Sequence, residues 1–156
     1  MNSPDTDTTI RTLTVANPYD LSPVDTVPEN TSPDVEQALD RAFALFRDRS
    51  SWLPAYERLA VLEKTVALME QRADRLIDTA IREGGKPRRD TRAEILRAID
   101  SVKATIAALR TDAGEVVPMN LTPAAGNRMA FTQREPVGVV VAVSAFNHPL
   151  NLIVHQ

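Results

Sequence analysis

The sequence predicts an α/β fold in which amphipathic helices precede a buried strand near the C-terminal end. Three patterns support this class. Residues 137–143 form an apolar, β-branched run after a Pro/Gly break, which is typical of a strand covered on both faces of a sheet. Apolar residues recur at helical spacing in three upstream segments. A polar, turn-prone segment, Asn147-His148-Pro149, follows the run, at the end of a strand where open α/β sheets bind ligands.

The overall composition is that of a soluble globular protein and excludes several classes of function. Of the 156 residues, 43% are hydrophobic and 25% are charged, and the net charge is -3. This charge offers no basic patch for nucleic acid or an anionic membrane, and aromatic residues at 4% provide no stacking platform for single-stranded nucleic acid. The chain contains no cysteine, which removes disulfides, thiolate metal sites and a cysteine nucleophile. Because we find no signal peptide and no membrane-spanning run, we expect a cytoplasmic protein.

The N-terminal region is expected to be a disordered tail followed by a short hairpin. Residues 1–11 are mostly small, polar and acidic, with little apolar surface to bury. Residues 12–15 alternate polar and apolar side chains, as a strand does. Asn17-Pro18 is typical of a turn, and residues 24–27 then form the returning strand.

Three helices are expected next, each with its apolar residues on one stripe. Their ranges are about 33–47, 55–83 and 91–110. Ser32-Pro33-Asp34 favours the first start, because Ser accepts from an unpaired N–H, Pro fits the first helical position and Asp complements the positive helix end. The second helix ends at Gly84-Gly85, where glycine adopts the left-handed conformation without penalty. Pro87 prevents its continuation.

The remaining residues change to strand and turn patterns. Residues 114–134 contain closely spaced prolines and glycines between short strand-like segments. The strand at 137–143 follows, and the residues after Pro149 begin another helical pattern. We therefore expect residues 12–156 to belong to one domain.

Three sets of residues resemble the aldehyde dehydrogenase superfamily, in the same order along the chain. Residues 134–140 with 145–150 are similar to the start of that family's cofactor domain, where a Glu-Pro-hydrophobic-Gly-Val strand precedes a Pro-aromatic-Asn-x-Pro turn. Asn17-Pro18 followed by residues 24–28 resembles the family's N-terminal hairpin. Residues 83–87 resemble its Glu-x-Gly-Lys-Pro segment.

The resemblance implies the N-terminal part of an NAD(P)-dependent aldehyde dehydrogenase, with an incomplete Rossmann-type sheet. Residues 114–134 then match the family's oligomerisation segment, so a homo-oligomer is expected in the full-length form. The family's lysine strand, glycine turn, catalytic Glu and nucleophilic Cys have no match in this chain. The chain alone is therefore expected to be inactive, with Val139, Val141 and Val143 exposed.

The resemblance also implies site residues and ligands. Asn147 matches the Asn whose side-chain NH₂ donates to the oxyanion that forms when a cysteine thiolate attacks the aldehyde. The positions that line the nicotinamide-ribose side of the NAD or NADP cleft match Val143, Ser144, Ala145 and Phe146. Ala145 departs from the Pro found in many members. The substrate implied is a small aldehyde, with a leaning toward hydroxy-, phosphono- or semialdehydes.

Other interpretations of the same residues remain open from spacing alone. Spacing favours Asn147 as a cap of the helix after Pro149, and it leaves open that Val143 is ordinary strand-end core and that Phe146 is a packing aromatic. No metal site is expected, because His148 and His155 lack a carboxylate or thiol partner at ligand spacing.

Two further local predictions concern charged residues. Lys86 is expected to complement a helix dipole, and the charges of residues 89–97 are expected to form a solvated face.

A helical interaction module and a truncated, non-catalytic homologue are the alternatives to an enzyme segment. The strand that ends at Asn147 favours the enzyme, because a helical adaptor does not need it.

Overall fold

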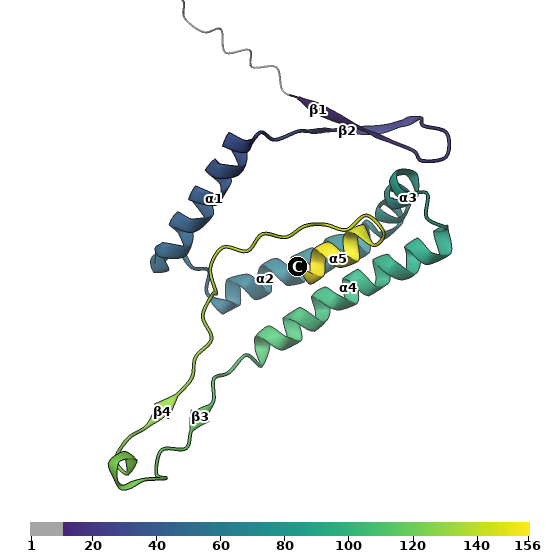
Figure 1. The fold of residues 1–156 in the computed structure, drawn as a ribbon. Coiled ribbons are helices and arrows are strands. Elements are labelled where there is room, and N and C mark those ends of the chain that lie inside the picture. The colour runs from purple at the N-terminus through teal and green to yellow at the C-terminus, as the bar shows by residue number, and fades with distance from the viewer. Residues whose placement is uncertain (1–10) are drawn as a thin grey trace, which may run out of the picture.

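The computed structural model describes residues 11–156, so the predicted disorder of residues 1–11 lies, apart from Arg11, outside the described residues. Helices dominate the fold, and two small sheets flank them (Figure 1). The elements in chain order are β1 (Thr12–Ala16), β2 (Pro23–Pro28), α1 (Ser32–Arg47), α2 (Ala55–Gln71), α3 (Ala73–Gly84), α4 (Arg88–Arg110), β3 (Val116–Val117), β4 (Ala130–Phe131) and α5 (Pro149–His155). None of the helices within 11–156 is long and apolar enough to cross a membrane.

The hydrophobic core lies where α2, α3 and α5 pack against α4. The long α4 supplies most of its side chains, because its apolar residues recur every three or four positions and share one face. The buried apolar residues are Val66, Met69, Ile77, Ile95, Ala98, Ile99, Val102 and Ile106. Burial of each large aliphatic side chain stabilises the fold by about 1.5–3 kcal/mol relative to exposure.

The helix expected over 55–83 is two helices, and that prediction is wrong. The chain leaves the helical conformation at Arg72, with φ -104° and ψ 11°, and α3 begins at the next residue. In α3, Ala73 and Leu76 are only partly buried, whereas Ile77 is buried. The break has a packing reason, because it allows both halves to lie against α4.

Other helix boundaries shift by a few residues. α1 begins at Ser32, so Thr31 and not Ser32 is the cap, and α4 begins directly after Pro87. The backbone N–H and the hydroxyl of Thr31 both donate to Asp34, each at 2.7 Å. These bonds hold the pKa of Asp34 below its usual 3.8.

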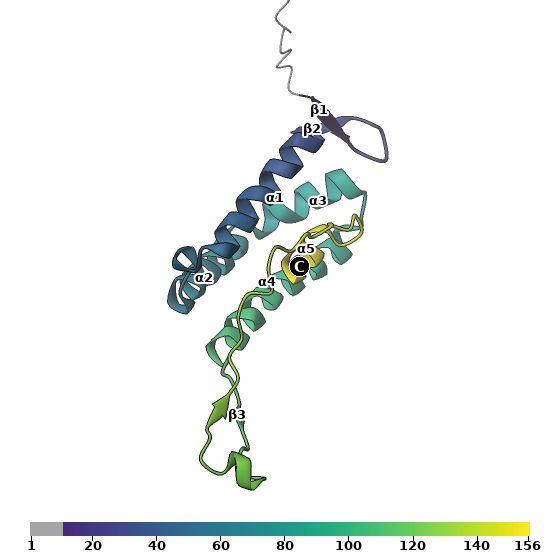
Figure 2. The same ribbon diagram turned by 60° about the vertical axis from the view of Figure 1, so that its left-hand side comes forward.

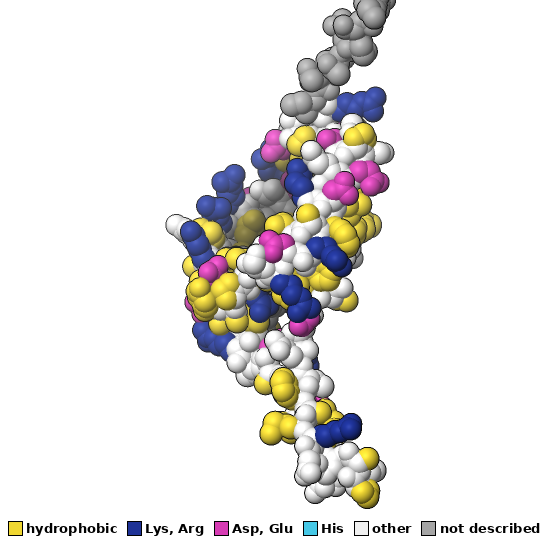
Figure 3. Space-filling model, turned by 90° about the vertical axis from the view of Figure 1, so that its left-hand side faces the viewer, with side chains coloured by type: hydrophobic (Ala, Val, Ile, Leu, Met, Phe, Trp, Pro, Cys, Tyr) yellow, Lys and Arg dark blue, Asp and Glu magenta, His cyan; other side chains and the backbone are white. Residues whose placement is uncertain are grey.

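α1 lies apart from the helical core and has no buried residue. A cluster at its C-terminal end anchors it to the turn that follows. The indole N–H of Trp52 donates to the Phe46 carbonyl at 3.1 Å, and the two rings stack with centroids 6.1 Å apart. Arg49 pairs with Glu135 at 2.9 Å, which ties this cluster to the segment before residue 137. Figure 3 views the molecule from the side on which α1 lies and shows hydrophobic side chains between charged ones there.

The N-terminal hairpin packs on the end of α3. Strands β1 and β2 pair in antiparallel fashion, with Thr12 opposite Pro28, as the alternation predicted. Gly85 ends α3 in the left-handed conformation at φ 65°, and a Cβ added there would lie 2.8 Å from the Cγ of Pro18. The glycine therefore permits both the helix end and the close approach of the hairpin loop.

The short strands expected within 114–134 form an antiparallel pair, β3 with β4. The ladder contains two residue pairs, Val116 with Phe131 and Val117 with Ala130. Pro118 immediately after β3 removes a backbone donor, which ends the ladder. Figure 2 shows the resulting arm extending away from the helices.

The strand predicted at 137–143 does not form in this structure. Its residues are not part of any ladder, because no described segment lies beside them to pair with. The expectation of a buried strand is therefore wrong for this chain. The expectation of exposed valines is confirmed, with Val139 38%, Val141 73% and Val143 78% exposed.

Candidate functional site

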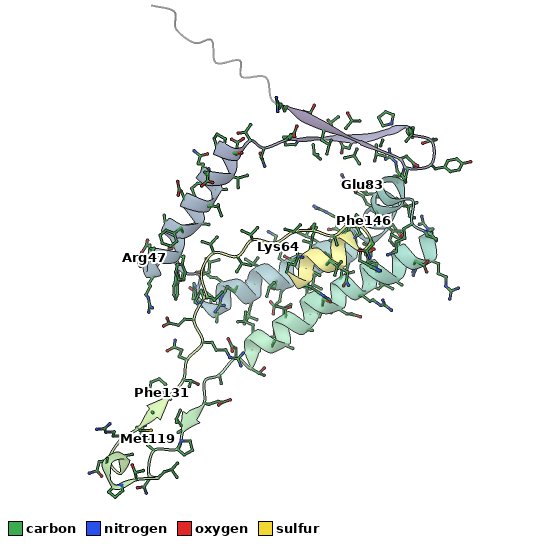
Figure 4. All side chains as sticks on the ribbon, viewed as in Figure 1. Arg47, Lys64, Glu83, Met119, Phe131 and Phe146 are labelled. Carbon is green, nitrogen blue, oxygen red and sulfur yellow. The ribbon has the colours of Figure 1, made fainter. Side chains whose placement is uncertain are left out.

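The turn that joins the extended segment to α5 lies at the mouth of a cleft of about 640 Å³. The walls come from the hairpin loop, the end of α3, the start of α4 and this turn. The lining residues are Pro18, Ala80, Glu83, Gly84, Lys86, Glu94, Phe146, Asn147, His148 and Pro149. Figure 4 shows Phe146 at the end of the extended segment, near Glu83 at the end of α3.

A buried carboxylate lies at the inner side of this cleft. The side chain of Glu94 is fully buried, and its Oε2 accepts from the Lys86 ammonium at 2.9 Å. Its Oε1 accepts from the backbone N–H groups of Leu150 at 3.1 Å and Asn151 at 3.4 Å. These are unpaired donors of the first turn of α5, so one carboxylate both neutralises a lysine and caps a helix from another element.

The lysine of this pair also contacts the turn itself. Lys86 Nζ donates to the Asn147 carbonyl at 3.2 Å and lies 3.0 Å from His148 Nδ1. An ammonium group only donates, so His148 Nδ1 is the acceptor in this contact. Lys86 thereby connects Glu94 to two consecutive residues of the turn.

Asn147 lies in the cleft wall with its side chain exposed. None of the hydrogen bonds found within 11–156 involves its side-chain amide. The interpretation of Asn147 as a helix cap is wrong, because the cap position of α5 is His148 and its side chain makes no capping bond. Glu94 serves that purpose instead. The Asn147 amide is therefore free to meet a ligand.

The four predicted cofactor residues lie along the chain just before Asn147. Phe146 is 94% exposed and lines the cleft with Asn147. Val143 and Ser144 are exposed outside it, and Ala145 is half-buried. The Val143 carbonyl accepts from the Gln156 side chain at 2.8 Å, which holds this segment against the end of α5. The exposure of Val143 and Phe146 contradicts their interpretation as packing residues in this chain.

Lys86 and Glu94 are site residues that were not predicted from the sequence. Lys86 does not merely complement the dipole of α3, and Glu94 is not on a solvated face. A signal was available for Glu94, because it falls on the same helical stripe as the buried Thr91, Ile95 and Ala98. A carboxylate on an apolar stripe requires a partner.

The two histidines are held by separate contacts. His155 Nε2 lies 2.9 Å from the Ser101 hydroxyl, whereas His148 contacts Lys86. His148 precedes the helix with ψ 64°, so the two histidines do not lie on one helix face. Within residues 11–156 no group of three or more His, Cys, Asp or Glu residues is arranged to hold a metal ion.

The helices beside a hairpin, the arm and the Asn-bearing turn together define the N-terminal part of an aldehyde dehydrogenase fold. The model of the aldehyde dehydrogenase family matches residues 5–156, and the chain belongs to this family. The resemblance seen in the sequence is thereby confirmed, as is the α/β fold class with its incomplete sheet.

Individual relatives agree with this assignment. The 3-sulfolactaldehyde dehydrogenase of Priestia megaterium is 34% identical over 150 residues, which are 96% of this chain and 31% of that protein. Aldehyde dehydrogenase 21 from Physcomitrella patens, solved with the product succinate, is similar with a TM-score of 0.88 and 34% identity, over 96% of this chain and 31% of that one. Glyceraldehyde-3-phosphate dehydrogenase from Methanocaldococcus jannaschii, complexed with NADP, has a TM-score of 0.81 and 29% identity, over 92% and 30%. The chain thus spans about a third of the length of these relatives.

Proposed function

We propose that this chain is the N-terminal segment of an NAD(P)-dependent aldehyde dehydrogenase that oxidises a small aldehyde to its acid. The main support is Asn147, whose unengaged amide lies in the wall of the cleft. The names of relatives support the substrate class, because they include dehydrogenases of 3-sulfolactaldehyde and lactaldehyde, both small hydroxyaldehydes.

Asn147 is the proposed oxyanion donor. An amide NH₂ donates without titrating, so its donor capacity is constant across the working pH range. The Lys86 contact fixes the Asn147 backbone carbonyl and leaves the side-chain amide available to donate to a ligand. A donor of this kind contributes about 10²–10³ in rate.

Residues Val143 to Phe146 are the proposed contacts to the nicotinamide-ribose side of NAD or NADP. The residues present fit such a group, because Val143 and Phe146 offer exposed apolar surface beside Asn147 and a ligand reaches them without disturbing the core. When bound, the dinucleotide supplies the hydride acceptor for the oxidation. The chain's own residues orient it and exclude water from one side.

Residues 12–156 are proposed to act as one portion of the aldehyde dehydrogenase domain, with the arm as an assembly surface. Three exposed apolar side chains of the arm support this role: Val116, Met129 and Phe131. A homo-oligomer of the full-length form would cover them. The Phe131→Glu variant of the full-length form should then have a lower molar mass by light scattering than the unaltered full-length form.

The experiment that tests the proposed function compares two proteins. The product of the full reading frame that encodes this chain is assayed with NAD and NADP against a panel of small hydroxy- and semialdehydes. The 156-residue chain is assayed in parallel, and it should show no turnover because it contains no thiol nucleophile. Aldehyde oxidation by the first and not the second supports the proposal. No oxidation by the full-frame product, or robust turnover by the 156-residue chain, would overturn it.

A further inference from the structure

Glu94 and Lys86 form an ion pair whose remaining hydrogen bonds all go to one turn. Besides each other, the carboxylate accepts from Leu150 and Asn151, and the ammonium contacts the Asn147 carbonyl and His148. The pair thus contacts the chain on both sides of Pro149. Lys86, in the connection before α4, and Glu94, on α4, thereby hold the backbone on both sides of Pro149.

We propose that Glu94 and Lys86 are positioning residues for Asn147. Lys86 holds the Asn147 carbonyl, Glu94 holds the first turn of α5, and the pair together sets the direction in which the Asn147 amide points. This proposal rests on the proposed function of Asn147 as an oxyanion donor. Neither residue of the pair contacts the reacting atoms in this role.

Stability alone does not account for the pair. The Glu94 side chain is fully buried and the Lys86 side chain is four-fifths buried, so both lose most of their hydration. Apolar residues of similar volume at a buried pair are often neutral or stabilising. The pair is explained by its geometry, because charge-assisted bonds orient a backbone more strictly than apolar contacts do.

The first test measures the turn directly in the 156-residue chain. Glu94→Gln keeps the shape of the side chain and removes its charge. Hydrogen exchange at the amides of Leu150 and Asn151 should rise about 10-fold, which corresponds to the replacement of a charge-assisted hydrogen bond by a weaker neutral one. Glu70→Gln is the matched control, because it makes the same change in a half-exposed ion pair that links α2 to α4, formed with Lys103 at 2.7 Å. It should leave these amides unchanged.

The second test separates positioning from stability in the product of the full reading frame. Lys86→Met leaves a buried carboxylate without its partner, so both the melting temperature and kcat should fall. Adding Glu94→Gln to Lys86→Met removes that lone charge, so the melting temperature should recover. The Asn147 carbonyl still lacks its donor, so kcat should remain lower by about 10- to 100-fold with KM changed less than about 2-fold.

The outcomes distinguish this proposal from the proposed function. Equal exchange in Glu94→Gln and the unaltered chain, or recovery of kcat together with the melting temperature in the double variant, would overturn the positioning role. An Asn147→Ala variant with unchanged kcat would overturn the oxyanion role, while faster exchange at Leu150 and Asn151 would still report the link to the turn.

Discussion

The packing of α4 predicts a large difference between two neighbouring residues of that helix. Ile95 is 1% exposed in the centre of the core, whereas Leu96, the next residue, is 50% exposed. Truncation of each to alanine removes three carbon atoms and places the best helix former at the site. The two variants therefore differ chiefly in burial, which makes Leu96→Ala a matched control for Ile95→Ala.

The expected magnitude follows from that burial. Three buried carbon groups at about 0.8 kcal/mol each give a transfer loss of about 2.4 kcal/mol for Ile95→Ala. A residual cavity adds to this loss, for a total of about 3–4 kcal/mol. Leu96→Ala loses about half of the transfer term and leaves no cavity, so about 1 kcal/mol is expected.

Urea unfolding of the 156-residue chain, followed by the helical circular dichroism signal, measures both values. The midpoints should separate clearly at an unchanged slope. Small domains have total stabilities of about 5–15 kcal/mol, so Ile95→Ala should remove a large share of the free energy of unfolding at 25 °C. A difference below about 1 kcal/mol between the two variants would refute the placement of α4 at the centre of the core.

Two more predictions concern the ends of helices. Gly85→Ala should lower the free energy of unfolding by about 1 kcal/mol or more, because φ is 65° and the new Cβ meets Pro18. Gly84→Ala should not lower the free energy of unfolding, because nothing lies within 4 Å of the new Cβ. Equal losses of stability for the two variants in denaturant titrations would contradict this explanation. The pKa of Asp34 in an NMR titration should lie below 3.8 and rise in Thr31→Val, which removes the hydroxyl donor but not the backbone donor. Because folding lowers the pKa of Asp34, its hydrogen bonds from Thr31 stabilise the start of α1 above pH 3.8, and this stabilisation is lost as the pH falls through the folded pKa. An unchanged pKa of Asp34 in Thr31→Val would show that the hydroxyl does not donate.

Local rules predicted the elements whose cause is local. The apolar stripe from Ile95 to Ile106 predicted the buried face of α4, and Gly84-Gly85 predicted the end of α3. The break at Arg72 was not predictable in this way, because no Gly or Pro marks it and its reason is packing against α4.

Only the part of the candidate site that depends on local sequence was predicted. A turn motif after an apolar run was enough to single out Asn147 and Phe146. Lys86 and Glu94 are 8 residues apart in sequence, and the turn that they contact lies more than 50 residues further along the chain. Local patterns do not reveal such a contact, so both charges were predicted to lie on the surface. The run at 137–143 was predicted as a strand from its β-branched residues, but a strand requires a neighbour, and no described segment provides one.

The central claim is that Asn147 supplies a donor to the oxyanion, and the kinetics of Asn147→Ala in the product of the full reading frame test it most directly. Since the side chain makes no hydrogen bond within 11–156, the melting temperature should change little. A donor used in the transition state should lower kcat about 10²–10³-fold with little change in KM. Asn127→Ala, an exposed amide in the distant arm, should leave kcat unchanged. A full kcat in Asn147→Ala, or a loss matched by Asn127→Ala, would contradict the assignment.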